Sequence, residues 1–259
     1  MRKNKKSMSQ MKHFGLILTL LTFFTTSNAQ DVVSVIEGKQ VKVTEAAETK
    51  AEYDAVIAPY RSQVNRDLDK ILAYNPVILD KSKGQWQSNI GDLMAKITFE
   101  KGNKVFEERT KKKVDVCILN HGGIRAMIGQ GNITARNAFE VMPFENAAVV
   151  IEIEGKYLVD FVTYFIKEKK PHPIAGLTFT ITASGVAKDI KVNNEPIVLD
   201  KVYNLVTNDY LASGGDKMEF LKKSTKTHVL DYKLRDMIID YFIDVDIIKV
   251  PTDIKVTQE

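Results

Sequence analysis

A glycine-rich segment follows the apolar run 114–119 and carries groups that bind polar ligands. It reads Asn120-His121-Gly122-Gly123-Ile124-Arg125. The two glycines lack Cβ atoms, so the backbone is able to turn tightly and to let a ligand approach its N–H groups. The planar guanidinium of Arg125 suits a phosphate or a carboxylate, and the amide of Asn120 suits ribose hydroxyls or a base edge. Gly-Gly after a strand is also typical of an ordinary turn, so this segment alone does not decide between the two.

Two further segments carry aromatic residues next to apolar runs. Phe144 stands in Met-Pro-Phe-Glu-Asn at 142–146, just before the apolar run 147–153, and Tyr210 stands in the stretch 208–216. Either ring taken singly is more typical of a hydrophobic core. Two rings at one mouth are able to sandwich a flat heterocycle, a contact worth ~1–3 kcal/mol per base. Asp216 is then placed to accept a hydrogen bond from a ribose or a base amine, although an Asp after Gly-Gly also closes turns.

Metal-binding residues are too few for a two-metal hydrolytic centre. Such a centre needs several His and Asp ligands around ions ~3.5–4 Å apart. Only His121, His172 and His228 follow residue 30, and none forms a D-x-H, G-N-H or H-x-H pattern. A G-x-S-x-G nucleophile elbow is also missing from the sequence. We therefore expect neither a metal site, nor a cofactor, nor a catalytic residue in this chain, and we interpret His121 as a loop residue near the ligand.

Helical periodicity and apolar runs predict the elements that position these segments. Helices are expected over 48–74, 88–106, 158–170 and 232–242, the second beginning at Ser88, a good N-cap residue. The runs 114–119 and 147–153 are almost continuously apolar, as in strands that are covered on both faces. Residues 177–182 alternate, as in a half-exposed antiparallel strand, and 190–192 and 203–207 complete the strands. Because strict βαβ alternation is missing, an α+β sandwich is favoured over a doubly wound sheet.

The first 29 residues have the layout of a secretory signal peptide. A basic start precedes an apolar run at 14–24, which is shorter than the roughly 20 residues of a membrane-spanning helix, and Ser27 and Ala29 frame a cleavage site. An uncleaved membrane anchor is the alternative. Five of the 37 Lys and Arg residues and none of the 33 acidic residues lie in this segment, which leaves 32 basic residues. We expect a periplasmic or secreted chain without a membrane span after cleavage, and its near-neutral charge gives no support for a nucleic-acid partner.

The order of the three segments resembles that in the C-terminal domain of 5′-nucleotidases. The motifs are N-x-G-G-I-R at 120–125, P-F-x-N at 143–146 and Y-L-A-x-G-G-D at 210–216, and the resemblance extends over most of 76–220. It implies a four-layer α/β/β/α sandwich over 76–250, preceded by an extended lead-in and helix over 30–75. In that family a separate N-terminal metallophosphoesterase domain carries two metal ions and cleaves the phosphate.

The resemblance also implies a role for each matching residue. Phe144 and Tyr210 become the rings that hold the nucleoside, and Arg125 holds its phosphate. The remaining positions either contact base and ribose or line the pocket: Asn120, Asn146 and Asp216, with Gly123 and Gly176. The chain departs from the family where an arginine usually precedes the segment that reads Gln-Ser-Asn-Ile-Gly-Asp here, because residues 81–90 contain none. Lys217 also replaces the glycine that usually follows G-G-D.

Three hypotheses follow. The first is an exported nucleotide-binding subunit of a split 5′-nucleotidase, paired with a separate metallophosphoesterase chain that brings the divalent metals. The second is a non-catalytic, secreted nucleoside- or nucleotide-binding protein, suggested by the missing arginine. The third is a domain whose pocket has degenerated and which serves as a structural module. Equal affinity for adenosine and AMP without a stable partner favours the second, and no nucleotide affinity at all favours the third.

Overall fold

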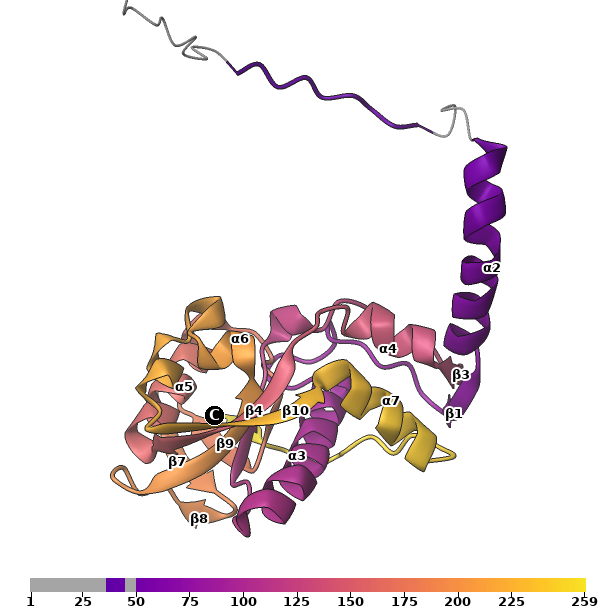
Figure 1. Ribbon diagram of the computed structural model, residues 1–259. Helices are drawn as coiled ribbons and strands as arrows, with labels where there is room; N and C mark the ends of the chain where they lie inside the picture. The colour runs from indigo at the N-terminus through magenta and orange to yellow at the C-terminus, as the bar shows by residue number, and fades with distance from the viewer. Residues whose placement is uncertain (1–35, 45–49) are drawn as a thin grey trace, which may run out of the picture. The chain divides into compact units, whose positions relative to one another are not determined.

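A helix and a short strand precede the body of the domain. The computed structural model describes residues 36–44 and 50–259 (Figure 1), so the predicted signal peptide at 1–29 lies outside the described residues. Helix α2 spans Ala51–Leu68 and strand β1 spans Ile71–Asn75. The predicted helix through residue 74 is wrong for its last residues, because β1 pairs antiparallel with β3, Gly131–Thr134. None of the α2 residues is buried, so the apolar face expected there does not enter the core.

A mixed five-stranded sheet forms the centre. Its strand order is β10-β4-β9-β2-β5, with β10 at Lys226–Lys233, β4 at Ala147–Glu154, β9 at Val202–Asn208, β2 at Val116–Ile118 and β5 at Ile174–Ala175. Strand β9 pairs parallel to β2 and antiparallel to β4. The almost continuous burial of β4 and β2 confirms that these strands are covered on both faces.

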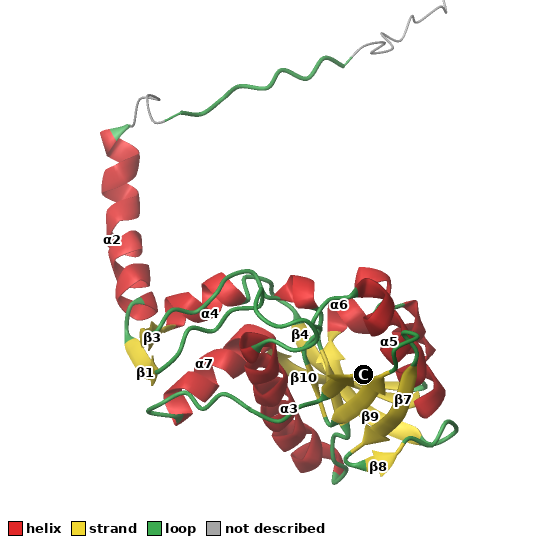
Figure 2. Cartoon of the chain, turned by 180° about the vertical axis from the view of Figure 1, so that it is seen from behind, coloured by secondary structure: helices red, strands yellow, loops and turns green. Residues whose placement is uncertain are grey.

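Two helices pack on one face of this sheet (Figure 2). Helix α3 spans Asn89–Thr110, and the Ser88 side chain accepts a hydrogen bond from the Gly91 backbone N–H at 3.2 Å, which confirms the predicted N-cap. Helix α7 spans Leu234–Asp244 and starts two residues later than predicted, because Tyr232 belongs to β10. Cys117, the one cysteine of the sequence, faces this core and burial raises the pKa of its thiol, so it acts as a packing residue.

The other face of the sheet borders a second core. Helix α5, Gly155–Glu168, contributes four buried apolar side chains at the predicted helical spacing: Leu158, Phe161, Val162 and Phe165. A four-stranded sheet shares this core, in the order β11-β6-β7-β8, with β11 at Val256–Gln258, β6 at Leu177–Ile181, β7 at Ala187–Val192 and β8 at Glu195–Pro196. Strand β6 buries alternate residues, as its sequence predicted. The α+β class and the sandwich of two sheets with helices are confirmed.

Short helical segments complete the chain. These are α4 at Ala135–Val141, α6 at Asp209–Ala212, and three 3₁₀ turns: η1 at His121–Gly123, η2 at Gly215–Lys217 and η3 at Glu219–Lys223. Because β11 pairs with β6, the sheet continues beyond the boundary expected at residue 250. Among residues 36–44 and 50–259, no helix is both long and apolar enough to cross a bilayer.

Candidate functional site

The sheet topology brings the three predicted segments to one edge. Strand β2 ends at Ile118 just before η1, and β9 ends at Asn208 just before α6. Because these strands are parallel, their carboxyl ends meet at the same edge. Strand β4 runs antiparallel to β9 and therefore begins there, with Ala148 opposite Asn208. Residues up to 96 positions apart in the sequence are thus neighbours because of the strand order.

One pocket of about 350 Å³ lies at this edge, within the range of small-molecule sites. We call it the ligand pocket. Seven of the eight predicted binding residues line it, together with Gly122: Asn120, Gly123, Arg125, Phe144, Asn146, Tyr210 and Asp216. Their roles in binding stay predictions, but the pocket provides aromatic, amide, carboxylate and guanidinium groups together.

The two aromatic rings of the ligand pocket are partly open to solvent. Phe144 is 42% exposed and Tyr210 is 45% exposed, although both side chains are large and apolar. The guanidinium carbon of Arg125 lies 5.8 Å from the centre of the Phe144 ring, at the outer limit of a cation–π contact. These rings therefore retain apolar surface that a flat ligand is able to cover.

Asp216 holds Tyr210 in place. The Tyr210 hydroxyl donates to Asp216 Oδ1 at 3.1 Å and accepts from the Asp216 backbone N–H at 3.0 Å. The Asn120 side chain donates from Nδ2 to Asp216 Oδ2 at 2.5 Å. Gly215 leaves room for the same ring, since a Cβ there would lie 2.5 Å from it. The carboxylate thus ties the first predicted segment to the third.

Lys81 stands next to Arg125, and sequence reasoning missed it. Its Nζ donates to the Ile124 backbone oxygen at 2.5 Å, across 43 residues of sequence. Burial, and then the positive charge of Arg125, lower the pKa of Lys81. Within the described part of the chain, neither cation forms an ion pair with a carboxylate. Two neighbouring cations without a counter-charge favour an anion. Two features of the sequence bear on this position: residues 81–90 contain no arginine, and the first of them is a lysine.

Gly176 does not join the ligand pocket. It lies between β5 and β6 and lines a different hollow, together with Asp92 and Lys96. Its φ of +73° is left-handed, and a Cβ at this position would lie 2.2 Å from the backbone oxygen of Asp115. The close backbone approach explains the glycine without any ligand. The structure therefore places Gly176 apart from the other seven predicted binding residues.

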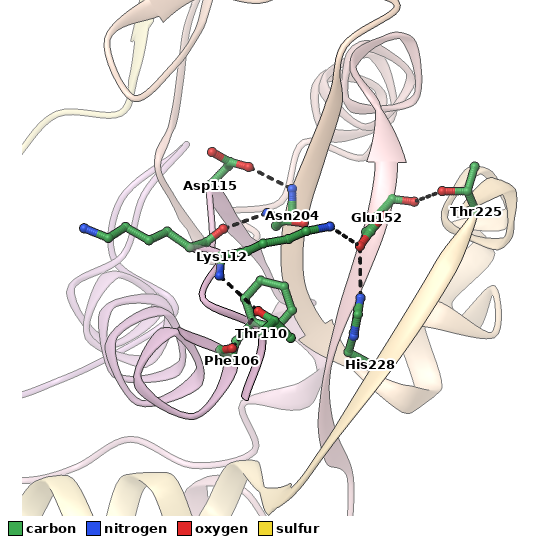
Figure 3. A network of polar contacts seen from close by, with 9 residues as sticks. Phe106, Thr110, Lys112, Asp115, Glu152, Asn204, Thr225 and His228 are labelled. Carbon is green, nitrogen blue, oxygen red and sulfur yellow. Dashed lines mark hydrogen bonds and ion pairs between the residues drawn. The ribbon is translucent and has the colours of Figure 1, made fainter. Parts of the chain in front are cut away.

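The histidines divide between two places. His121 and His172 lie beside the ligand pocket, and the His121 backbone N–H donates to Nδ1 of His172 at 3.2 Å. His228 lies on β10, where its Nε2 pairs with Glu152 at 3.0 Å (Figure 3). Lys112 donates to the same carboxylate oxygen, and His228 together with Lys112 lowers the pKa of Glu152. No cluster of three or more His, Cys, Asp or Glu side chains suited to a metal occurs among residues 36–44 and 50–259.

The comparisons with known proteins agree with the geometry. The model of the family "5′-nucleotidase, C-terminal domain" matches residues 75–223. Protein UshA of Escherichia coli is 27% identical over 153 residues, covering 53% of this chain and 28% of UshA. Cell wall protein Lmo0130 of Listeria monocytogenes is 26% identical over 230 residues, covering 78% of this chain and 28% of that protein. The chain therefore spans less than a third of either relative.

A solved structure shows the same fold. The 5′-nucleotidase precursor from Thermus thermophilus superimposes with a TM-score of 0.67 at 21% identity, covering 80% of this chain and 43% of that one. At this identity the similarity concerns the fold, which accords with the α+β sandwich described above.

Proposed function

Because the chain belongs to the 5′-nucleotidase C-terminal domain family, we propose that it is the nucleotide-binding subunit of a split 5′-nucleotidase. The observation that carries the proposal is the ligand pocket, which two half-exposed rings and Arg125 line, while Lys81 contacts the Ile124 backbone beside it. A nucleotide has a flat apolar base and a charged phosphate, so it matches both halves of this arrangement.

In this proposal, different residues bind the base, the ribose and the phosphate of the nucleotide. The base stacks between Phe144 and Tyr210, and the Asp216 carboxylate, oriented by Asn120, accepts from the ribose or the base. Asn146 contributes an amide to the same contacts. Arg125 and Lys81 receive the phosphate, with the planar guanidinium suited to two oxygens and the ammonium acting as a point charge.

Hydrolysis in this proposal is assigned to a second chain. A separate metallophosphoesterase supplies the divalent metals that activate water, while this chain binds and orients the nucleotide. Both chains are exported to the same compartment, and the name of Lmo0130 as a cell wall protein supports an extracytoplasmic location. The partner has a single-domain size of roughly 250–300 residues.

Phosphate release tests the proposal directly. The purified protein is incubated with AMP and Mg²⁺, Mn²⁺ or Zn²⁺, alone or with an exported metallophosphoesterase from the same source. We expect release only from the mixture, and a large loss when Phe144→Ala replaces the wild-type protein. Robust metal-dependent release by this chain alone contradicts the split arrangement.

A binding measurement beside the assay distinguishes the split enzyme from a binding protein without an enzymatic partner. A calorimetric titration with adenosine and AMP accompanies the assay. Equal affinities for the two ligands, with no phosphate release from any mixture, favour a nucleoside-binding protein without an enzymatic partner. The neighbouring Lys81 and Arg125 lead us to expect tighter binding of AMP instead.

A further inference from the structure

The two rings of the ligand pocket are not held in the same way. Tyr210 makes two hydrogen bonds to Asp216. Phe144 has no polar group in its side chain, is 42% exposed and lies in the short loop 142–146 between α4 and β4. Its contact with Arg125, at 5.8 Å, is at the outer limit of a cation–π interaction. The position of the Phe144 ring therefore depends on what holds the loop.

Arg235, in the first turn of α7, contacts this loop on both sides of Phe144. Its Nη1 donates to the backbone oxygen of Pro143 at 3.3 Å, and its Nη2 donates to Oε1 of Glu145. These two residues are the direct neighbours of Phe144 in the sequence. A guanidinium presents several N–H donors in one rigid plane, so a single side chain restrains both neighbours at once.

Other contacts fix Arg235 and the loop in the same place. The guanidinium carbon of Arg235 lies 4.1 Å from the centre of the Phe139 ring, which belongs to α4. Lys233 donates to the second carboxylate oxygen of Glu145. Hydrogen bonds from Arg235, and then from Lys233, lower the pKa of Glu145 to about 2, so the carboxylate is charged at neutral pH. None of these four side chains lines the ligand pocket.

The burial of Arg235 is poorly explained by stability alone. The residue is 5% exposed, and its Nε is buried without a partner among the described residues. Burying a charged group with an unsatisfied donor is costly, and an apolar side chain of similar volume often stabilises a fold at least as well. An apolar side chain would not, however, hydrogen-bond to the two neighbours of Phe144.

We propose that Arg235 is a positioning residue, which acts through Pro143 and Glu145 to keep the Phe144 ring at the ligand pocket. The inference rests on the proposed function, in which this ring stacks on the base. Without the two contacts the loop adopts more positions, and the ring occupies its binding position for a smaller fraction of the time. The apparent affinity falls by that fraction. The loss is the same for adenosine and AMP, because both carry the base.

A double-mutant cycle measured by calorimetry tests the proposal. Arg235→Lys keeps the charge, but an ammonium lacks the planar fork, so we expect binding of AMP and of adenosine to weaken alike, by about fivefold. In Phe144→Ala protein the same change should alter either affinity by less than about twofold, because the ring through which Arg235 acts is missing. Arg109→Lys is the control and should leave both affinities unchanged. Arg109 also donates to a backbone oxygen and to a carboxylate, those of Val229 and Asp231, outside the pocket.

Backbone ¹⁵N relaxation of the ligand-free protein adds a readout that needs no nucleotide. Arg235→Lys should lower the order parameters of the Phe144 and Glu145 amides and leave that of Tyr210 unchanged. Glu145→Gln, a change at an exposed residue, should loosen the same amides by a smaller amount. If Arg235→Lys does not fold, Glu145→Gln takes its place in the cycle.

Three results overturn the proposal: unchanged affinities in Arg235→Lys, an equal loss in the wild-type and Phe144→Ala backgrounds, and a loop as rigid in the variant as in the wild type. A wild-type protein that binds neither AMP nor adenosine is a different failure, which removes the proposed function. A loosened loop in Arg235→Lys would then still support the positioning of Phe144 by Arg235, so the two failures are distinguishable.

Discussion

Aromatic rings occur in two settings in this protein, and the difference shows where a ligand is expected. In the second core, Phe161, Phe165 and Phe179 are buried against one another, with an edge-to-face contact of 5.4 Å between the last two. In the ligand pocket, Phe144 and Tyr210 are about half exposed, and Tyr210 is fixed by hydrogen bonds to Asp216. The first set is positioned by burial and stabilises the fold. In the second set, hydrogen bonds hold Tyr210 and both rings keep exposed apolar surface.

Truncating a core ring should have the largest effect, and it should act on stability. Phe165→Ala removes a fully buried ring between α5 and β6, which we expect to lower the free energy of unfolding by about 3–5 kcal/mol. Urea denaturation monitored by circular dichroism measures the change. A loss below about 1 kcal/mol would show that the ring is not part of a tightly packed core.

Truncating a pocket ring should act on binding instead. Phe144→Ala should weaken AMP binding by about 5- to 150-fold, from the loss of ~1–3 kcal/mol of stacking, and leave the free energy of unfolding within about 0.5 kcal/mol of wild type. Tyr74→Ala is the matched control, because Tyr74 is 42% exposed and lies on β1, outside the pocket. Calorimetry and urea denaturation measure both quantities. Equal losses of AMP affinity in the two variants would contradict a specific role of the half-exposed pocket rings in binding.

Removing the charge of Lys81 should distinguish binding of the phosphate from binding of the nucleoside. Lys81→Gln should weaken AMP binding by about tenfold, through the loss of a charge-assisted contact, and leave adenosine binding unchanged. Lys83→Gln, an exposed lysine of the same loop outside the pocket, is the control. The two ligands are titrated by calorimetry at low and moderate salt. If adenosine loses as much affinity as AMP, then Lys81 supports the loop and not the phosphate.

The smallest effect is expected at Glu152, which forms a polar cluster with His228 and Lys112 outside both the second core and the ligand pocket (Figure 3). Hydrogen bonds from His228, and then from Lys112, lower the pKa of Glu152. Its stabilisation is therefore present above the unfolded pKa of about 4.3 and is lost as the pH falls through the lower folded value. Wild type should exceed Glu152→Gln in stability near neutral pH, and the gap should narrow on acidification. Glu195→Gln is the matched control; a gap that widens toward low pH contradicts the assignment.

The regular elements of this fold were predictable where one pattern dominates. The helix around Phe161 and Phe165 has a clear apolar stripe, and the strand 147–153 is apolar except for Glu152, so both were found. Residues 71–74 were assigned to a helix because Ile71 and Leu72 continue its periodicity. Their pairing with β3, some 60 residues later, is a tertiary contact that local periodicity does not contain.

The residues of the candidate site were also predictable from the sequence only in part. Motifs at the ends of strands β2, β4 and β9 identified seven of the residues that line the ligand pocket, because these strand ends share an edge. Gly176 was placed with them on resemblance alone, and its left-handed turn against Asp115 shows a backbone reason for the glycine. Lys81 was missed because its contact with Ile124 depends on how a loop folds back, for which a single lysine in sequence gives no signal.

The most direct test is a crystal structure of the protein with AMP. We expect the adenine to lie between the rings of Phe144 and Tyr210, with the phosphate within hydrogen-bonding distance of Arg125 and Lys81. An ordered nucleotide bound elsewhere, or in this pocket with its phosphate directed away from both cations, would contradict it.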